Sequence, residues 1–243
     1  MSASIDIVIP VYNEEDALPV SIPKLCSFLR NNLAIPWRVT IADNASIDGT
    51  RAVSEELSRE AEGVNYLYLP EKGRGRALRA AWLGSECDYV SYMDVDLSTD
   101  LSHFPALVGK LESGWHVAIG SRLSRGSNVT QRSFKRELTS RTYNKLIWSL
   151  FFVGFPDAQC GFKAMTRQAA QAIIPQVKNN NWFFDTELLI IAEKRGYRIG
   201  VVPVAWEDDP SSTVNVVKTA TEDIKGLLRL RFGGIPRVDP PPP

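Results

Sequence analysis

Histidine and cysteine are scarce in this chain of 243 residues, and their scarcity argues against several kinds of chemistry. The only histidines are His103 and His116, and no GxSxG, HExxH or Cys–His pattern is present, so serine hydrolysis and zinc chemistry have little support. The cysteines Cys26, Cys87 and Cys160 form no CxxC pair and no metal-ligand spacing. We therefore expect them to be reduced thiols in a cytosolic protein.

Net charge and long apolar runs are absent as well. Lys and Arg total 28 and Asp and Glu total 28, so no overall field attracts nucleic acid. The longest nearly apolar stretch, residues 146–155, is about half the ~20 residues that a membrane-spanning helix needs. The N-terminus lacks the features of a signal peptide. A hydrophobic content of 44% with 23% charged residues instead predicts one sizeable globular core.

Short β-branched runs alternate with helical patterns along the chain. The runs predict strands at 5–9, 37–42, 64–69, 88–93, 116–120, 161–165 and 198–204. The helical patterns lie at about 14–33, 48–61, 73–83, 137–152, 185–195 and 217–232, and a long polar loop is expected at 121–136. Such alternation favours an α/β fold with an open, mostly parallel sheet and helices on both faces.

Ligands of such sheets bind at the carboxyl ends of the strands. Asp94 and Asp96 follow the expected strand at 88–93, and residues i and i+2 of an extended chain point the same way. Two carboxylates on one side of a cavity suit Mg²⁺ or Mn²⁺ shared with a diphosphate. The alternative is a solvated acidic turn, with Asp100 capping the next helix.

Two further strand ends carry candidate ligands. Asp43 could accept a hydrogen bond from a nucleobase, whereas Asp48 is expected to cap the helix after it. Residues 72–76 (KGRGR) form a basic turn before a helix, which is either a diphosphate site or a solvated turn. Leu78 stands where a dinucleotide fingerprint needs glycine, and no GxxxxGK[ST] motif is present, so Rossmann dehydrogenases and P-loop NTPases are disfavoured.

Basic residues are concentrated in the segment 121–145, whose local charge is +6 although the whole chain is neutral. They are Arg122, Arg125, Arg132, Lys135, Arg136, Arg141 and Lys145, with Glu137 as the single acid. This concentration favours an anionic partner. No DNA- or RNA-binding signature accompanies it, so we expect no nucleic acid.

Taken in order, these motifs resemble the family 2 glycosyltransferases of the GT-A fold, a Rossmann-like architecture. Within that family they are similar to the polyprenyl-phosphate sugar synthases of the dolichyl-phosphate glucose or mannose synthase type. The residues that carry the resemblance are 10–14 (PVYNE), Asp43 with 48–50 (DGT), 72–75 (KGRG), 94–97 (DVDL), 120–122 (GSR), 159–163 (QCGFK) and 184–189 (FDTELL).

The resemblance implies roles at matching positions of the donor site. The residues that would line the nucleotide or grip its base are Pro10, Tyr12, Glu14, Ile41 and Asp43. Asp94, Val95 and Asp96 would contact the sugar nucleotide, with Asp96 as the principal metal ligand. Ser98 stands where mannosyl-transferring members often have Gln, and we include it in the expected metal shell with Asp94 and Asp96. Lys72 would bind the diphosphate.

For the acceptor, the resemblance implies a polyprenyl phosphate held by Arg122 and by one of Arg132, Lys135 or Arg136. Asp94, Asp96 and Arg122 would be the catalytic residues. A lipid phosphate is already anionic and needs no general base, whereas a hydroxyl acceptor does. Asp185 is the candidate base in that second case, or else caps the helix that follows it.

The expected activity is therefore inverting, metal-dependent transfer of a hexose from a nucleotide diphosphate sugar to a polyprenyl phosphate at the cytoplasmic face of a membrane. UDP-glucose is the favoured donor and GDP-mannose the second. Two alternatives stay open: a transferase acting on a saccharide or small-molecule hydroxyl, and a non-catalytic nucleotide-sugar binding protein.

The expected organisation is a glycosyltransferase domain at 1–215, an amphipathic helix at 216–232 and a Pro-rich tail at 233–243. One face of that helix carries Val217, Ala220, Ile224, Leu227 and Leu228. The helix either docks on a membrane surface or packs on the core as an ordinary surface helix. The partner is then the membrane surface, or a membrane segment missing from this sequence. Whether the chain forms a homo-oligomer is left open.

Overall fold

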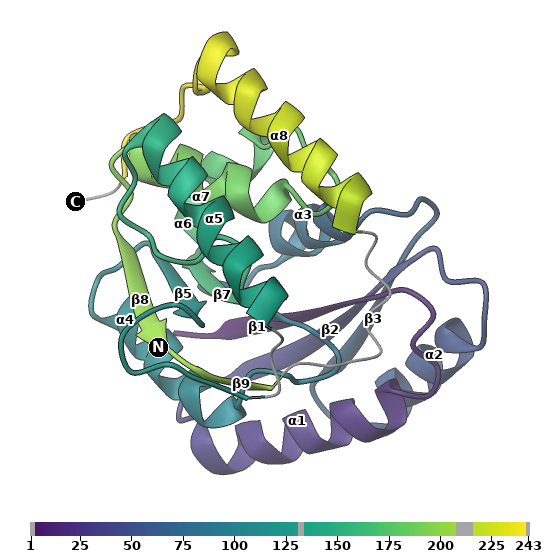
Figure 1. The fold of residues 1–243 in the computed structure, drawn as a ribbon. Helices are drawn as coiled ribbons and strands as arrows, with labels where there is room; N and C mark the ends of the chain where they lie inside the picture. The colour runs from purple at the N-terminus through teal and green to yellow at the C-terminus, as the bar shows by residue number, and fades with distance from the viewer. Residues whose placement is uncertain (1–2, 131–133, 208–215, 242–243) are drawn as a thin grey trace.

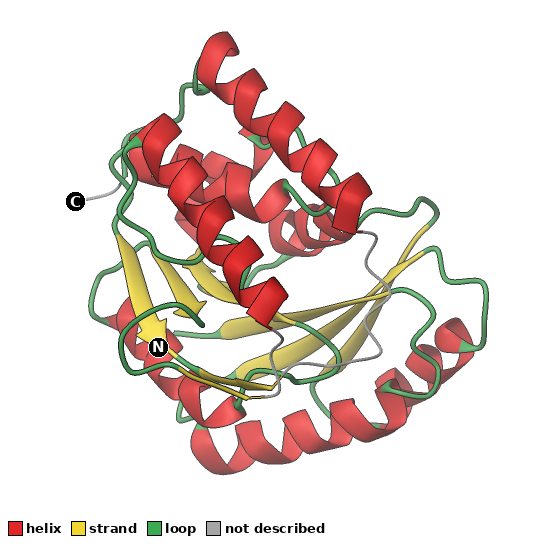
Figure 2. Cartoon of the chain, in the orientation of Figure 1, coloured by secondary structure: helices red, strands yellow, loops and turns green. Residues whose placement is uncertain are grey.

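A seven-stranded sheet forms the centre of the molecule (Figures 1 and 2). The computed structural model describes residues 3–130, 134–207 and 216–241, without the side chains of 134–136 and 216–218. The strands are β1 (Ile5–Val11), β2 (Trp37–Asn44), β3 (Val64–Leu69), β4 (Tyr89–Met93), β5 (Val117–Ser121), β7 (Phe162–Thr166) and β8 (Ile199–Pro203). Their order is β3-β2-β1-β4-β7-β5-β8, and only β7 runs antiparallel to its neighbours.

Helices cover both faces of this sheet (Figure 2). One layer contains α1 (Leu18–Asn32), α2 (Thr50–Glu60) and α4 (Phe104–Glu112). The other contains α3 (Arg74–Gly84), α5 (Phe134–Phe151), α6 (Arg167–Ile173), α7 (Phe184–Lys194) and α8 (Val216–Gly233). The predicted α/β class with a mostly parallel sheet is confirmed.

The side chains of the central strands divide between two hydrophobic cores. Ile5, Ile7 and Ile9 of β1 pack with α1 and α4, whereas Val8 packs with the helices of the opposite layer. A strand that is buried on both faces exposes neither set of side chains to water, so its sequence does not alternate between polar and apolar residues. This is why the sequence of β1 is apolar apart from Asp6, whose buried carboxylate pairs with Arg38.

The region after β5 differs from the expected loop at 121–136. It contains a short strand, β6 (Asn128–Thr130), which pairs in parallel with β9 (Ala205–Glu207), and α5 already begins at Phe134. The helices α4 and α6 were not predicted either. Three-residue strands exist only through their pairing with distant residues, and short helices depend on tertiary packing, so local patterns reveal them poorly.

The predicted C-terminal helix is present as α8, which lies beside α5 (Figure 1). Leu227 and Leu230 are buried against the core, whereas Ile224, Leu228 and Phe232 are exposed. The apolar side chains of α8 are thus divided between the core and the surface. After α8, the backbone carbonyls of Pro236 and Asp239 accept hydrogen bonds from Arg195 and Tyr197, so this part of the predicted tail lies against the domain.

No helix within residues 3–130, 134–207 and 216–241 is both long and apolar enough to cross a membrane.

Candidate active site

The carboxyl ends of β1, β2 and β4 bring the predicted donor residues to one edge of the sheet. The parallel register pairs Val11 of β1 with Asp43 of β2, and β4 ends at Met93, directly before Asp94. Tyr12, Asp43 and Asp94 therefore follow neighbouring strands at the same edge. The topology provides the site that the strand-end rule predicts.

Asp43 is fully buried and its orientation is fixed by two hydrogen bonds. Its Oδ1 accepts from the backbone N–H of Ser46 at 2.9 Å, and its Oδ2 accepts from the hydroxyl of Tyr66 at 2.9 Å. A carboxylate oxygen can accept more than one hydrogen bond, so these bonds leave capacity for a ligand N–H. Ile41 is likewise fully buried, with its side chain in the hydrophobic core, and its contact with a base stays a prediction.

The two loops predicted to bind the nucleotide and its diphosphate touch each other. Lys72 Nζ lies 3.2 Å from the centroid of the Tyr12 ring, a cation–π contact. Pro10 pairs with Ala42 within the sheet, and the backbone N–H of Glu14 donates to Thr50 Oγ1 at 2.7 Å. The PVYNE segment is thereby fixed against the loop that follows β2.

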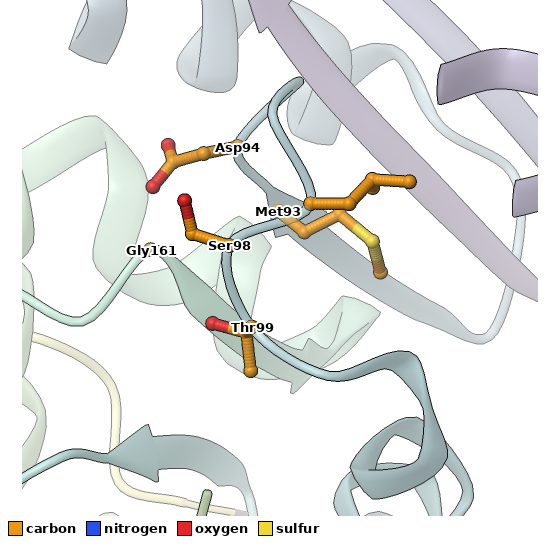
Figure 3. A pocket seen from close by; sticks show the side chains of 6 residues that line it. Met93, Asp94, Ser98, Thr99 and Gly161 are labelled. Atoms are coloured by element: carbon orange, nitrogen blue, oxygen red, sulfur yellow. The ribbon is translucent and has the colours of Figure 1, made fainter. Parts of the chain in front are cut away.

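Asp94 borders a small pocket whose lining is Met93, Asp94, Leu97, Ser98, Thr99 and Gly161 (Figure 3). Figure 3 shows the Asp94 carboxylate and the Ser98 hydroxyl on the same side of this pocket. Gly161 is the residue that allows Asp94 to lie here, because a Cβ atom at position 161 would overlap Asp94 Oδ2. Val95, between the two aspartates, is buried.

Asp96 lines a different and larger groove between α1 and the β6–β9 pair, and Ser98 borders both the groove and the small pocket. The backbone N–H of Ser98 donates to Asp96 Oδ1 at 2.9 Å, which keeps both side chains in one tight turn. Carboxylate and hydroxyl oxygens are the hard ligands that Mg²⁺ and Mn²⁺ prefer, so the donor set of Asp94, Asp96 and Ser98 fits either ion. Among the described residues no three His, Cys, Asp or Glu side chains converge, so diphosphate and water would complete the coordination.

Arg74 joins Asp94 to a buried ion-pair network. Its Nη2 lies 2.7 Å from Asp94 Oδ1 and its Nη1 lies 2.6 Å from Asp185 Oδ2. The other oxygen of Asp185 accepts from the Tyr92 hydroxyl at 2.7 Å and lies 3.2 Å from Lys163 Nζ. Asp94, one of the predicted metal ligands, is thus positioned by Arg74, which was predicted only as part of the basic turn 72–76.

Asp185 is not placed to act as a free base. Burial by itself would raise its pKa, but Lys163 and Arg74 outweigh burial and hold the pKa below its ordinary value. A carboxylate with both oxygens occupied and a lowered pKa is a poor proton acceptor. Only 3% of Asp185 is exposed, and its contact with substrate stays a prediction.

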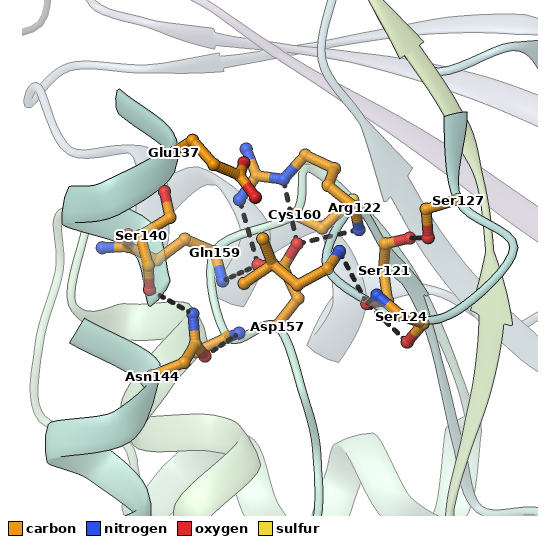
Figure 4. Close-up of polar contacts among 12 residues, drawn as sticks. Ser121, Arg122, Ser124, Ser127, Glu137, Ser140, Asn144, Asp157, Gln159 and Cys160 are labelled. Atoms are coloured by element: carbon orange, nitrogen blue, oxygen red, sulfur yellow. Dashed lines mark hydrogen bonds and ion pairs between the residues drawn. The ribbon is translucent and has the colours of Figure 1, made fainter. Parts of the chain in front are cut away.

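Arg122 is held by Asp157, a residue that sequence reasoning missed (Figure 4). Nε and Nη2 of Arg122 donate to the two oxygens of Asp157 at 2.9 and 3.0 Å, and the Arg122 backbone N–H donates at 3.0 Å. Burial would raise the pKa of Asp157, but Arg122 holds it below its ordinary value. The guanidinium also lies 5.3 Å from the Trp206 ring centroid, so its orientation is fixed from two sides.

The structure describes only some of the other basic side chains of the segment 121–145. Arg141 pairs with Glu137 at 2.6 Å on the surface of α5. Arg132 lies outside the described residues, and the side chains of Lys135 and Arg136 are not described. The second cation expected for the acceptor phosphate therefore stays a prediction.

Four residues complete the site without having been predicted as site residues: Arg74, Asp157, Gly161 and Lys163. The sequence carries one signal for Lys163, which interrupts the apolar strand FKAMT. A lysine within a buried strand needs an anionic partner, and here that partner is Asp185.

The sequence of this chain is similar to those of known glycosyltransferases. The family description Glycosyl transferase family 2 matches residues 6–174. The glycosyltransferase AglD of Haloferax volcanii is 34% identical over 229 residues, which cover 92% of this chain but 35% of AglD. The human dolichyl-phosphate beta-glucosyltransferase is 31% identical over 246 residues, covering 94% of this chain and 75% of that protein.

Solved structures show the same fold at lower identity. Glucosyl-3-phosphoglycerate synthase from Mycobacterium tuberculosis, in complex with Mn²⁺, UDP and phosphoglyceric acid, superposes with a TM-score of 0.71. The two chains are 19% identical, and the match covers 97% of this chain and 80% of that one. Because the family match spans most of the chain and includes the strand ends that form the site, this protein belongs to glycosyl transferase family 2.

Proposed function

We propose that this glycosyltransferase moves glucose from UDP-glucose to a polyprenyl phosphate, with inversion at the anomeric carbon and with help from Mg²⁺ or Mn²⁺. The observation that carries the proposal is the arrangement of charges in the site. Carboxylates face the donor side, buried cations stand beside them, and Asp185, the carboxylate that would serve a hydroxyl acceptor, is occupied by Arg74, Lys163 and Tyr92. Such a site suits an acceptor that is already anionic.

On the donor side, each residue has a binding or orienting task. Asp43 binds the base, Tyr12 and Lys72 lie along the nucleotide and its diphosphate, and Asp94, Asp96 and Ser98 hold the metal ion. When bound, the metal ion supplies positive charge that stabilises the departing nucleoside diphosphate. Arg74 keeps Asp94 oriented toward the metal, because its other contacts with Asp185 and Tyr92 fix the guanidinium.

On the acceptor side, Arg122 binds the lipid phosphate and orients it for attack. Asp157 accepts from Nε and Nη2, which leaves further N–H groups of the guanidinium for phosphate oxygens. A phosphate oxygen attacks the anomeric carbon as the bond to the diphosphate breaks. This single displacement inverts the configuration, and no covalent sugar–enzyme intermediate is needed.

Glucose is favoured over mannose because several relatives that match more than 90% of the chain are named dolichyl-phosphate beta-glucosyltransferases. The chain covers about three quarters of those proteins, 74% in the Dictyostelium discoideum relative. GDP-mannose is the second candidate donor. The fold neighbour bound to Mn²⁺ and UDP makes Mn²⁺ the first metal to test.

The proposal predicts metal-dependent transfer of labelled glucose to a short polyprenyl phosphate, with GDP-mannose run in parallel. Asp96→Ala should lower the rate by at least about 10²-fold, because the metal loses a ligand at the developing diphosphate charge. Asp100→Asn is the matched control, since Asp100 lies in the same loop but caps a turn by accepting from Ser102 N–H. Equal rates for Asp96→Ala and wild type would contradict the metal site. Donor binding without transfer to any acceptor would favour the non-catalytic alternative.

An exposed apolar surface on α5 and α8 supports reaction at a membrane. Its members are Trp148, Phe152, Ile224, Leu228 and Phe232, of which Phe152 and Phe232 are 70% and 83% exposed. Two neighbouring helices that both present large apolar side chains form the kind of patch that binds a lipid surface. We propose that this α5–α8 surface docks on the cytoplasmic face of the membrane that holds the acceptor, in keeping with the three free cysteines.

Combining Phe152→Ser with Phe232→Ser should weaken binding to anionic lipid vesicles by about 10²-fold or more, since each exposed aromatic loses roughly 1.5–3 kcal/mol of apolar burial. Vesicle cosedimentation measures this. The control is Val20→Ser, which alters an exposed apolar residue of α1 in the opposite helix layer. Unchanged binding of the double variant, or equal weakening by Val20→Ser, would remove the docking proposal.

A further inference from the structure

The segment 157–161, between α5 and β7, contacts both the donor side and the acceptor side of the candidate site. Asp157 binds Arg122 through its side chain, and Gly161 provides the space for Asp94. The backbone N–H of Gln159 donates to Asp157 Oδ1 at 3.2 Å, so the segment forms a turn that fixes the Asp157 side chain, which in turn binds Arg122. Any group that fixes this segment therefore fixes Arg122.

Two helices of the outer layer fix it, each with one side chain. Asn144 of α5 accepts from the backbone N–H of Ala158 through Oδ1 at 3.0 Å, as Figure 4 shows. Asp223 of α8 accepts from Gln159 Nε2 through Oδ2 at 3.0 Å. The same two helices carry the α5–α8 surface on their outward sides.

Asp223 is 4% exposed, and its carboxylate has two side-chain partners, Gln159 and the Tyr143 hydroxyl of α5. A buried carboxylate destabilises a fold compared with an apolar side chain of similar size unless its polar contacts offset the loss of solvation. Burial raises the pKa of Asp223 to about 7, although the hydrogen bonds from Tyr143 and Gln159 act in the opposite direction. The contacts with Gln159 and Tyr143 are what an apolar residue could not provide.

We propose that Asn144 and Asp223 are positioning residues through which α5 and α8 hold the segment 157–161, and with it Arg122, in place for the acceptor phosphate. This inference rests on the proposed function and names the link between its membrane-docking helices and its acceptor site. Neither residue touches substrate. Their effect should therefore appear in the use of the acceptor and not in the use of the donor.

The test is steady-state kinetics with UDP-glucose and a short polyprenyl phosphate at pH 8, where the Asp223 carboxylate is ionised. Asp223→Ala should raise KM for the polyprenyl phosphate about tenfold, the effect of losing a hydrogen bond to a charged group. KM for UDP-glucose should stay within about twofold. Asp223→Asn keeps an oxygen acceptor for Gln159 and should restore most of the acceptor KM. Asn144→Ala should change KM in the same direction as Asp223→Ala.

Gln159→Ala should change the acceptor KM in the same direction as Asp223→Ala, and the double variant should be no worse than Asp223→Ala alone, because both changes remove the bond between these two side chains. Glu222→Ala is the control on α8, because Glu222 accepts from Asn179 and Asn181, which lie before α7 and outside the segment 157–161. Equal effects of Glu222→Ala and Asp223→Ala, or additive effects of Asp223→Ala and Gln159→Ala, would overturn the inference. If the wild type transfers glucose normally and Asp223→Ala keeps the wild-type KM for the polyprenyl phosphate, this inference is wrong and the proposed function stands. A wild type that uses no polyprenyl phosphate removes the proposed function, and this inference with it.

Discussion

Asp157→Ala is expected to destabilise the protein by about 3–5 kcal/mol and to abolish sugar transfer. Asp157 is fully buried and only 11% of the Arg122 side chain is exposed, so the substitution leaves a buried guanidinium without its counter-charge. Breaking one partner of a buried ion pair has a cost of about this size. Chemical denaturation of the wild type and the variant measures the free energy of unfolding.

An exposed ion pair serves as the control, because breaking it removes a salt bridge without leaving a buried charge. Glu55→Ala removes the partner of Arg51 on α2, where both side chains are largely exposed, and should change the free energy of unfolding by less than about 1 kcal/mol. Combining Arg122→Leu with Asp157→Leu should recover most of the stability that Asp157→Ala loses, because no buried charge is left. That double variant should still be inactive. Recovery of transfer in it would contradict the role of Arg122 at the acceptor.

Gly161→Ala is expected to lower the rate of transfer by about 10²-fold with little loss of stability. A methyl group at position 161 would occupy the space of Asp94 Oδ2, so Asp94 must leave its contact with Arg74 and the position from which it is proposed to bind the metal. A displacement of about 1 Å in a catalytic group has an effect of this order. Transfer assays at saturating donor and a Mn²⁺ titration would detect the loss.

Gly109→Ala is the control for this change. Nothing lies within 4 Å of a Cβ atom at position 109, which is inside α4, and alanine there should stabilise the helix by roughly 1 kcal/mol. Its transfer rate should equal that of the wild type. An active Gly161→Ala enzyme with unchanged Mn²⁺ affinity would show that the position of Asp94 does not limit the reaction.

The fold was largely predictable because its central strands are buried on both faces. Runs such as IDIVI can only be core strands or buried helix, and their short length between helical patterns decides for strands. The elements that escaped prediction lack such a pattern. β6 and β9 are three residues long and pair across the chain, and α6 shows only a local cap, in which Thr166 Oγ1 accepts from Ala169 N–H at 3.2 Å.

The candidate site was predictable where a local pattern marks it and unpredictable where a distant partner defines it. The spacing of Asp94 and Asp96 is visible in the sequence, as is the density of basic residues after β5. The pairing of Arg122 with Asp157 joins residues 35 positions apart, and that of Arg74 with Asp185 joins residues 111 positions apart. No periodicity or composition encodes these pairs. They decide which charges remain available to substrate, and for Asp185 they argue against a role as base.

The most direct test of the central claim compares a polyprenyl phosphate with the polyprenol of the same chain length as acceptors for labelled UDP-glucose and Mn²⁺. The two lipids share the same apolar chain and differ only in the phosphate that Arg122 is proposed to bind. We predict label in the product of the phosphate alone, and loss of that label in Arg122→Leu. Glycosylation of the polyprenol at a comparable rate would mean that the enzyme activates a hydroxyl, and would contradict the account of a site built for an anionic acceptor.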